Sequence, residues 1–485
     1  MNKIKISAFL ILVVLFGSCD LETFNRATLT PSQSLADSLG FRSLVFSAYE
    51  RTNDFTFYGQ QTMMHPEVMA DNMILVSTTR YAGQAANTVG NHMDRWGQDT
   101  GGGATLSDGR YTTINECNTV IAKIDAMTNI PPSLKSRYKG EAYFLRALNY
   151  LELHRVYSYE PGREVNGFNL GVVLRTEPVE KVSDGDLKAR STNVEGYTLM
   201  EADLIQAATL LPNPSAVSAT LAPYRATKQA ARALLAKVYL HWGKYAEATQ
   251  QADLALAFSF APLTTSANFV SSWTQTPHPE SIFESPIVPG DWTTVDGPNN
   301  SLHSMTMNLI SASQYAVAAS NELIAAHEAG DVRRNLYENV AGAGPAGTQA
   351  RHRSRKWAGG NVANAFLENI PIIRRAEVML ISAEGKARSG NEPGALAILN
   401  VLRASRGLGA VADTGAALLD RILNERRVEL AFEGNRWFDL KRLGRDITKP
   451  AGTTSAVPYA DFRILARIPV EQVAINPAIV QNPGY

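Results

Sequence analysis

Cysteine is nearly absent from this 485-residue chain, which contains only Cys19 and Cys117. Two cysteines cannot build a disulfide framework, and their spacing does not fit a zinc site. A surplus of positive charge is absent as well, because 46 Lys and Arg side chains balance 46 Asp and Glu side chains. A chain without a basic surplus is not expected to bind a nucleic acid backbone, so no nucleic acid partner is predicted.

After residue 18 the sequence also lacks an apolar run long enough to span a bilayer, which takes about 20 residues. The one long apolar run occupies residues 6–16, follows two lysines and ends before a glycine, a serine and Cys19. This pattern is typical of a secretory signal, and the cysteine after small residues favours a lipoprotein signal. Phe16 stands where bacterial lipoprotein signals usually carry leucine, so an ordinary signal peptide with a chance cysteine is the alternative. We predict that residues 1–18 are removed and that a lipid on Cys19 anchors the chain to a membrane.

Sequence signatures of common enzymes are missing, because no HExxH, GxSxG or phosphate-binding GxxxxGK motif occurs. Glu429 and Glu433 would share one face of a helix, but the arginines around them would hold both carboxylates ionised. We interpret that passage as a buried arginine–carboxylate lattice rather than an acid–base pair. The charge run at 351–356, which contains His352, predicts a solvated loop. No catalytic residue, metal ligand or cofactor is predicted.

Helical periodicity is what the sequence has in abundance. Residues 139–157 are apolar on nearly every face, which indicates a helix buried on several sides. Thr192 and Glu195 have the spacing of a capping box, which predicts a helix that begins there and ends before Pro212.

Two further segments have the order of large, small and turn residues that is typical of a tetratricopeptide hairpin. In 227–258 the matching residues are Leu235, Ala236, Tyr239, Gly243, Tyr245, Ala248, Ala252 and Ala255. In 373–406 they are Ala383, Gly390, Ala395 and Leu399. Hairpins near 139–212, 227–258 and 373–406 predict a mostly α fold, a superhelical scaffold in a single domain at 19–485. Long irregular insertions are expected near 53–116, 158–191 and 259–370.

Five passages resemble the SusD/RagB family of outer-membrane nutrient-binding lipoproteins. They are KGEAYFLRALNYLEL at 139–153, DLIQAATLLP at 203–212, IPIIRRAEVMLISAE at 370–384, NERRVELAFEGNRWFDLKR at 424–442, and the ending IPV at 468–470 with NP at 476–477 and QNPGY at 481–485. Together with the lipoprotein signal, they extend through nearly the whole chain.

The resemblance implies a SusD-like fold in which tetratricopeptide-like hairpins support variable loops. It also implies a lipid-anchored, surface-exposed protein of the outer membrane that captures a nutrient, usually a glycan, without chemical change. The implied partner is a TonB-dependent β-barrel transporter of the SusC type.

Sugar binding makes a separate demand on the residues, because a pyranose has an apolar face that an exposed aromatic ring covers and polar edges that hydrogen-bond. The candidate rings inside the insertions are Trp96, Tyr81, Trp273 and Trp292. Trp96 follows Ala70-Asp71-Asn72, which resembles a family passage that leads into the ligand-facing loops, so Asp71 and Asn72 are candidate ligand-binding residues as well. For each ring the alternative is an aromatic packed on the scaffold.

Two other functions stay open at this stage. A repeat scaffold could bind a peptide or protein in its groove, which requires a concave face free of insertions. A glycoside hydrolase is less favoured and requires two carboxylates that face each other across a cleft.

Overall fold

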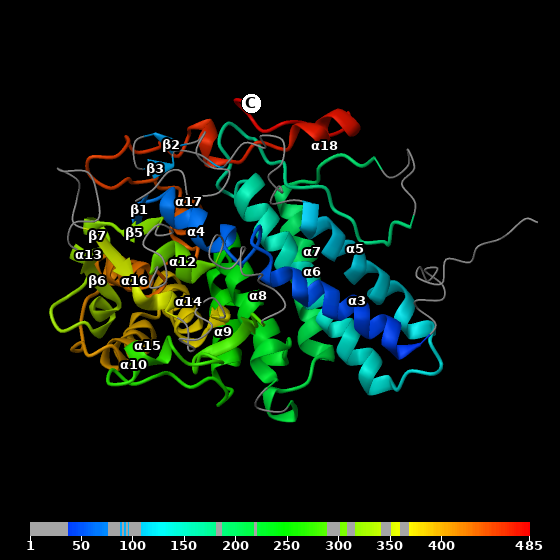
Figure 1. The fold of residues 1–485 in the computed structure, drawn as a ribbon, viewed down its shortest axis with the longest axis horizontal. Helices are drawn as coiled ribbons and strands as arrows, with labels where there is room; N and C mark the ends of the chain where they lie inside the picture. Colours follow the sequence, from blue (N-terminus) through cyan, green and yellow to red (C-terminus); the bar gives the residue numbers. More distant parts are fainter. Residues whose placement is uncertain are drawn as a thin grey trace, which may run out of the picture.

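The computed structural model describes residues 37–75, 88–89, 92–93, 96, 108–180, 187–217, 221–288, 301–307, 316–340, 351–358 and 368–485. Helices dominate this part of the chain (Figure 1), which confirms the predicted fold class. The predicted signal peptide at 1–18 and Cys19 lie outside the described residues. Within those residues, no helix combines the length and the apolar character that crossing a membrane requires.

The helices are α3 (Ser38–Glu50), α4 (Gln61–Val68), α5 (Asp108–Lys123), α6 (Pro132–Tyr157), α7 (Asn193–Leu210), α8 (Lys228–Trp242), α9 (Tyr245–Leu256), α10 (Phe269–Ser272), α12 (Leu302–Thr306), α13 (Asn321–Ala325), α14 (Arg375–Arg388), α15 (Glu392–Ser405), α16 (Gly415–Glu429), α17 (Arg436–Arg442) and α18 (Val470–Ile475). The strands are β1 (Met73–Leu75), β2 (Thr88–Val89), β3 (His92–Met93), β4 (Ser281–Ser285), β5 (Val317–Ala319), β6 (Tyr337–Val340), β7 (Arg351–Ser354) and β8 (Ile370–Arg374). In Figure 1, α3, α5, α6 and α7 lie together at one end of the molecule, and β1, β5, β6 and β7 gather at the other.

The helix predicted at 139–157 is the C-terminal part of α6. It begins earlier, at Pro132, where proline fits because the first turn of a helix has no use for its N–H. Nearly every residue of α6 from Gly140 onward is buried, as its all-round apolar pattern predicts. The predicted capping box is present at the start of α7, where Thr192 and Glu195 each bond the other's backbone N–H.

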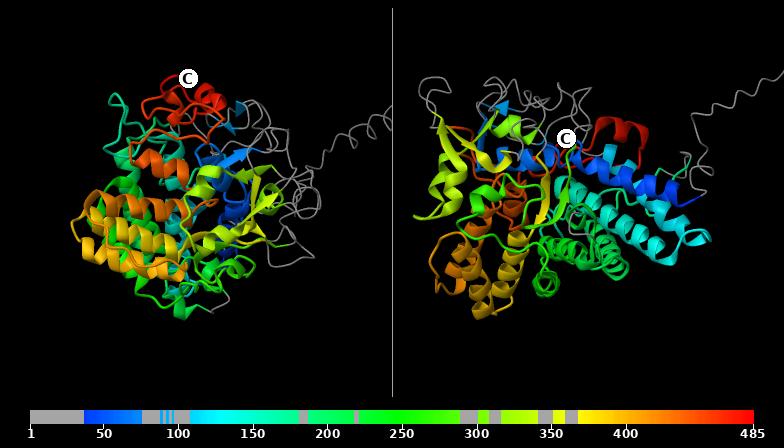
Figure 2. Two further views of the ribbon diagram at one scale, coloured as in Figure 1. Left: turned by 90° about the vertical axis from the view of Figure 1, so that its left-hand side faces the viewer. Right: turned by 60° about the horizontal axis from the view of Figure 1, so that its bottom comes forward.

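The two tetratricopeptide-like segments form the predicted helix pairs α8–α9 and α14–α15. Gly243 ends α8 with a φ of +78°, and Gly390 follows α14 with a φ of +81°, conformations that residues with a Cβ rarely adopt. Small residues bring α14 close to α9, because a Cβ on Gly385 would lie 2.3 Å from Thr249 Oγ1. Figure 2 shows these helices from two further sides.

The long insertions contain more regular structure than the sequence analysis predicts. They supply an antiparallel four-stranded sheet in the order β1-β5-β7-β6, and their strand β4 pairs with β8 in a separate two-stranded sheet. The solvated loop expected at 351–356 is wrong, since this segment is β7 followed by a short 3-10 helix at Arg355–Trp357. His352, Ser354 and Lys356 are buried while Arg353 and Arg355 are not, which is the alternation of a strand.

The passage at 424–442 is a buried ion-pair lattice, as interpreted from the sequence. Arg374 donates to Glu280, Glu429 and Glu433 over 2.6–3.0 Å, and its side chain is fully buried. Arg406 also donates to Glu280 and Glu429. Burial alone would raise the pKa of Glu429, but Arg406, Arg374 and Arg333 together hold it well below its usual value. The carboxylates of this lattice join segments that are distant in sequence, and each is bonded to at least one arginine.

Candidate functional site

The ends of several insertions meet at one end of the four-stranded sheet. Leu75, the last residue before the undescribed segment 76–87, pairs with Val317 of β5. Val317 in turn follows the undescribed segment 308–315 by two residues. The backbone N–H of Ala316 donates to the carbonyl of Met305 in α12 over 3.0 Å, so α12 belongs to the same cluster.

Two more insertions begin and end beside α12. His303 donates from Nδ1 to the carbonyl of Trp357 over 2.9 Å and from its backbone N–H to Glu368 Oε1 over 2.6 Å. Trp357 and Glu368 flank the undescribed segment 359–367. The neighbouring Asn369 accepts from the backbone N–H of Ile287, close to the start of segment 289–300. We call this cluster the insertion platform and define it by Leu75, Ile287, Met305, Ala316, Val317, His303, Trp357, Glu368 and Asn369.

A hollow of about 270 Å³ lies at the platform, which we call the platform hollow. Its lining is formed by Trp273, Gln275, Thr276, His278, Lys356, Trp357, Glu368, Asn369 and Pro371. Two buried polar atoms of this lining, Trp273 Nε1 and Glu368 Oε2, have no hydrogen-bond partner among the described residues. A donor and an acceptor left open in one hollow are what a polar guest such as a sugar hydroxyl can satisfy.

Carboxyl groups in and beside this hollow are protonated more readily than usual. Burial raises the pKa of Glu368 to about 8, against the opposing effect of the His303 N–H. Burial likewise raises the pKa of Glu284 to about 7, although Asn369 and the backbone N–H of His278 bond its oxygens. At neutral pH Glu368 is therefore largely a neutral acid that can both donate and accept a hydrogen bond.

Trp273 lines the platform hollow, but the predicted exposure of its ring is wrong. Only 6% of Trp273 is exposed. Its ring meets Trp357 edge-on at 5.8 Å and lies 4.7 Å from Lys356 Nζ. An open stacking face for a pyranose is thus missing at Trp273, and its indole N–H is the group that remains free to bond.

Trp96 is also buried rather than exposed, with 3% of its surface accessible. Its ring stacks on Phe438 at 5.6 Å and meets Trp437 edge-on at 6.0 Å. Both partners belong to the lattice passage at 424–442. The prediction of an exposed ring fails because a loop residue's sequence neighbours do not reveal a partner from the far end of the chain.

Asp71 and Asn72 are engaged with the same passage. Arg436 donates to both oxygens of Asp71 over 2.6 and 2.9 Å, and Thr448 adds a third bond of 2.7 Å. Burial opposes ionisation, but Arg436 and Arg427 outweigh it and lower the pKa of Asp71 to about 2. Asn72 accepts from Arg427 and donates to Glu67. The expected ligand-facing placement of these side chains is wrong, because both are buried and bonded within the protein.

Tyr81 and Trp292 lie outside the described residues. They belong to segments 76–87 and 289–300, whose described neighbours Leu75 and Ile287 are part of the insertion platform.

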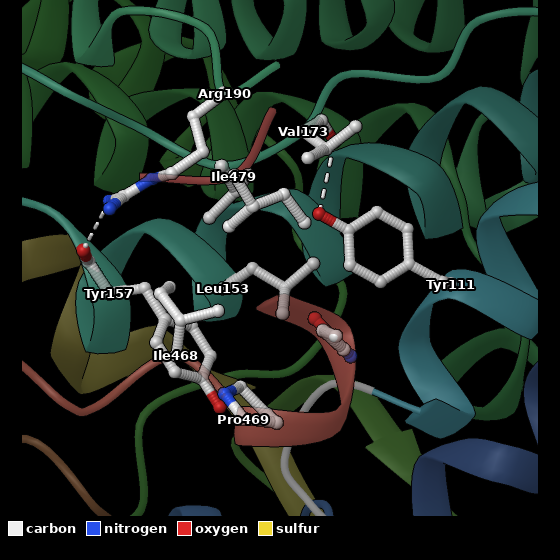
Figure 3. A pocket seen from close by; sticks show the side chains of 10 residues that line it. Tyr111, Leu153, Tyr157, Val173, Arg190, Ile468, Pro469 and Ile479 are labelled. Carbon is white, nitrogen blue, oxygen red and sulfur yellow. Dashed lines mark hydrogen bonds between the residues drawn. The ribbon is translucent and has the colours of Figure 1, made fainter. Parts of the chain in front are cut away.

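Two other hollows differ from each other in their polar groups. The apolar hollow in Figure 3, of about 310 Å³, lies between α5, α6 and the C-terminal segment. There Tyr111 donates to the carbonyl of Val173, and Arg190 donates to carbonyls that include that of Tyr157. Within the described residues, no lining side chain has a buried polar atom without a partner. The second, also of about 310 Å³, lies at the start of α5 and contains Arg110. Among the residues that the structure describes, no group of three or more His, Cys, Asp or Glu side chains could hold a metal ion.

Comparison with known proteins identifies similar chains that match nearly the whole length of this one. A family model described as "SusD family" matches residues 348–485, and another, described as "Starch-binding associating with outer membrane", matches residues 37–240. The SusD-like protein P2 of Formosa agariphila is 25% identical, and the match covers 100% of both chains. The SusD-like protein P38 of the same organism is 27% identical over 77% of this chain and 78% of its own.

Solved structures share the fold. A SusD superfamily protein from Bacteroides thetaiotaomicron matches with a TM-score of 0.79 and 23% identity, covering 91% of this chain and 99% of its own. A SusD-like carbohydrate binding protein from Bacteroides vulgatus matches with a TM-score of 0.74 and 21% identity, covering 90% of this chain and 96% of its own.

Proposed function

Because the chain belongs to the SusD/RagB family, we propose that it captures a glycan at the cell surface and passes it unchanged to a TonB-dependent transporter of the SusC type. The family description of starch binding and outer-membrane association supports the carbohydrate class and the location. One structural relative is itself a carbohydrate binding protein. The observation that carries the proposal is the insertion platform, which brings the described ends of separate insertions to one place.

The glycan binds at the platform through two kinds of contact. Tyr81 and Trp292 supply rings that cover the apolar faces of sugar units, since their segments begin beside platform residues. The platform hollow supplies open polar groups, Trp273 Nε1 and Glu368 Oε2, for sugar hydroxyls. Catalysis has no part in this proposal, because Glu429 and Glu433 are bonded to lattice cations.

Affinity electrophoresis of the purified chain in gels that contain single polysaccharides tests the binding step. We expect retardation by at least one polysaccharide, and loss of most of it in Tyr81→Ala or Trp292→Ala. Trp273→Phe keeps a ring but removes the open N–H, so affinity falls by roughly three- to tenfold. The control is Phe462→Ala, an exposed ring on the C-terminal segment. Absence of retardation across a broad polysaccharide panel would reject the proposal.

The anchor is tested separately by metabolic labelling with palmitate. The wild type should incorporate label in the membrane fraction, and Cys19→Ala should not. Equal labelling of the two chains would exclude a lipid on Cys19.

Copurification in mild detergent tests the transporter partnership. A large β-barrel protein should remain bound to the lipid-anchored chain, with or without glycan. If the β-barrel protein is absent both from the detergent-purified samples and from crosslinked samples, the proposed hand-off to a transporter is rejected.

A further inference from the structure

The hollow at the start of α5 contains an arginine that has no carboxylate partner among the residues that the structure describes. Its lining is Arg51, Asp54, Thr56, Phe57, Gly109, Arg110, Thr113 and Asn149. Arg110 is only 4% exposed, and its guanidinium lies 3.6 Å from the centre of the Phe57 ring. It donates a hydrogen bond of 3.2 Å to the Thr56 carbonyl, while Nη1 has no partner in the described part of the chain.

Nearby carboxylates are already engaged by other groups. Glu152 accepts from Arg155 and Tyr58, and Glu116 accepts from Arg51 through Oε1, while its buried Oε2 has no partner among the described residues. Asp54, which lines the hollow, accepts from the backbone N–H and hydroxyl of Thr56. Burial lowers the pKa of Arg110 to about 10, because Glu152 and the other neighbouring groups offset burial only in part.

Two further atoms of the lining are also open. Arg51 Nε is buried without a partner, although the same guanidinium bonds Glu116 through Nη2. Asn149 donates to the Leu145 carbonyl over 2.8 Å, and its Oδ1 has no partner. Two arginine N–H donors and one amide oxygen of the lining residues are therefore buried without a partner in the part of the chain that the structure describes.

We propose that this Arg110 hollow is a subsite for the carboxylate of an acidic sugar. Arg110 Nη1 and Arg51 Nε donate to the carboxylate oxygens, and Asn149 Oδ1 accepts from a hydroxyl of the same sugar unit. The inference rests on the proposed glycan-binding function and adds a substrate class, saccharides that contain uronic acid. The positive end of the α5 macrodipole adds a favourable field for an anion, while Asp54 opposes it.

The segment that carries Arg51 is hydrogen-bonded to the segment that leads into the insertion platform. Thr52, next to Arg51, shares a hydrogen bond of 2.6 Å with Ser285 at the end of β4. Asn53 donates to the carbonyl of Pro286, which directly precedes the platform residue Ile287. These two bonds connect the segment that lines the hollow with the segment that leads into the platform. We therefore include in the proposal that one saccharide contacts both the platform and Arg110.

Calorimetric titration with paired oligosaccharides tests this assignment. The panel contains oligomers of galacturonate, glucuronate, mannuronate and guluronate, each paired with its carboxyl-reduced neutral form. We expect at least one acidic oligomer to bind roughly ten- to a hundredfold more tightly than its neutral pair, the range of one charge-assisted hydrogen bond. Arg110→Gln and Arg110→Met should each abolish that preference, whereas the exposed Arg42→Gln should retain it.

The outcomes separate this inference from the proposed function. Equal binding of the acidic and neutral pairs, or a preference that persists in both Arg110 variants, overturns the subsite and leaves glycan binding intact. Binding of sulfated oligosaccharides in place of uronates overturns the carboxylate assignment. If no saccharide binds, acidic or neutral, the proposed function and the subsite both fail. Should an Arg110 variant not fold, the wild-type preference and Arg51→Gln decide the question.

Discussion

Buried arginines are treated in opposite ways in two regions of this protein. In the lattice around Glu429, each fully buried arginine has carboxylate partners, as Arg374 and Arg406 show. In the hollow at the start of α5, Arg110 is nearly as buried but lies over Phe57 without a carboxylate. Removing an arginine from water costs several kcal/mol unless partners replace the lost hydration. In the lattice, carboxylate partners offset the cost of burying each arginine. Around Arg110 the cost is offset only in part, so a donor remains that a ligand can satisfy.

The largest expected effect comes from breaking the lattice at its centre. Glu429→Gln removes the charge shared by Arg333, Arg374 and Arg406, and should destabilise the chain by about 3–5 kcal/mol. Urea unfolding of the purified protein measures the loss. The control is Glu338→Gln, whose partners Arg353 and Arg355 are partly exposed and which should cost about 1 kcal/mol or less. Equal losses in the two variants would contradict the central role of Glu429.

Substitution of Trp96 tests whether this loop aromatic stabilises the fold, as the lattice does, or contacts a ligand. Trp96→Ala removes a ring packed on Phe438 and Trp437 and should cost about 3–5 kcal/mol of unfolding free energy. Thermal and urea unfolding measure this, and Trp96→Phe should lose less. Full stability together with lost glycan binding would instead restore Trp96 as a ligand-contacting residue.

The pH dependence of stability should have opposite signs at Glu368, which lines the platform hollow, and at Asp71, which is bonded to the lattice passage. Burial raises the pKa of Glu368 to about 8, so its stabilising effect is complete below its unfolded value and is lost as pH rises toward 8. That loss is at most about 1.4 kcal/mol per pH unit, and Glu368→Gln should remove it from the unfolding profile. Asp71, with a pKa lowered to about 2, stabilises the fold above its unfolded value and loses this effect as pH falls to 2. A Glu368→Gln profile parallel to the wild type between pH 5 and 8 would reject this assignment.

The smallest effect on stability is expected at Arg110. Replacing a buried, incompletely paired cation by a packed apolar side chain is often neutral or stabilising, so Arg110→Met should change unfolding free energy by no more than about 1 kcal/mol in the unfavourable direction. Urea unfolding without ligand gives the value. A loss as large as that of Glu429→Gln would show that Arg110 has a structural role like that of the lattice arginines.

The helical scaffold could be predicted in detail because its signals are local. The capping box of Thr192 and Glu195, and the turns at Gly243 and Gly390, depend on residues only a few positions apart. The lattice was also predictable in kind, since many charges of both signs in one apolar passage must pair when they are buried. In 351–356, residues that become buried alternate with residues that do not, which is a local pattern of a strand. The prediction of a solvated loop rested on the charges of this segment and overlooked that pattern.

The predicted ligand residues fared worse because exposure depends on distant partners. Asp71 bonds Arg436, and Trp96 stacks on Phe438, each more than three hundred positions away in the sequence. No local pattern distinguishes such a buried side chain from one that faces a ligand. Arg110 was missed for the same reason, since an unpaired arginine looks like any other until its neighbours are known.

The amino-acid sequence alone determined the helical hairpins and the family resemblance, because short-range periodicity, capping and small residues specify them, while the secretion signal stays a prediction. Tertiary structure decided which charges are paired, which rings are buried and which polar atoms remain open, because those partners come from segments hundreds of residues apart. The difference between Glu429 and Arg110 is of this second kind, and it directs the search for the ligand to the insertion platform and the hollow beside it.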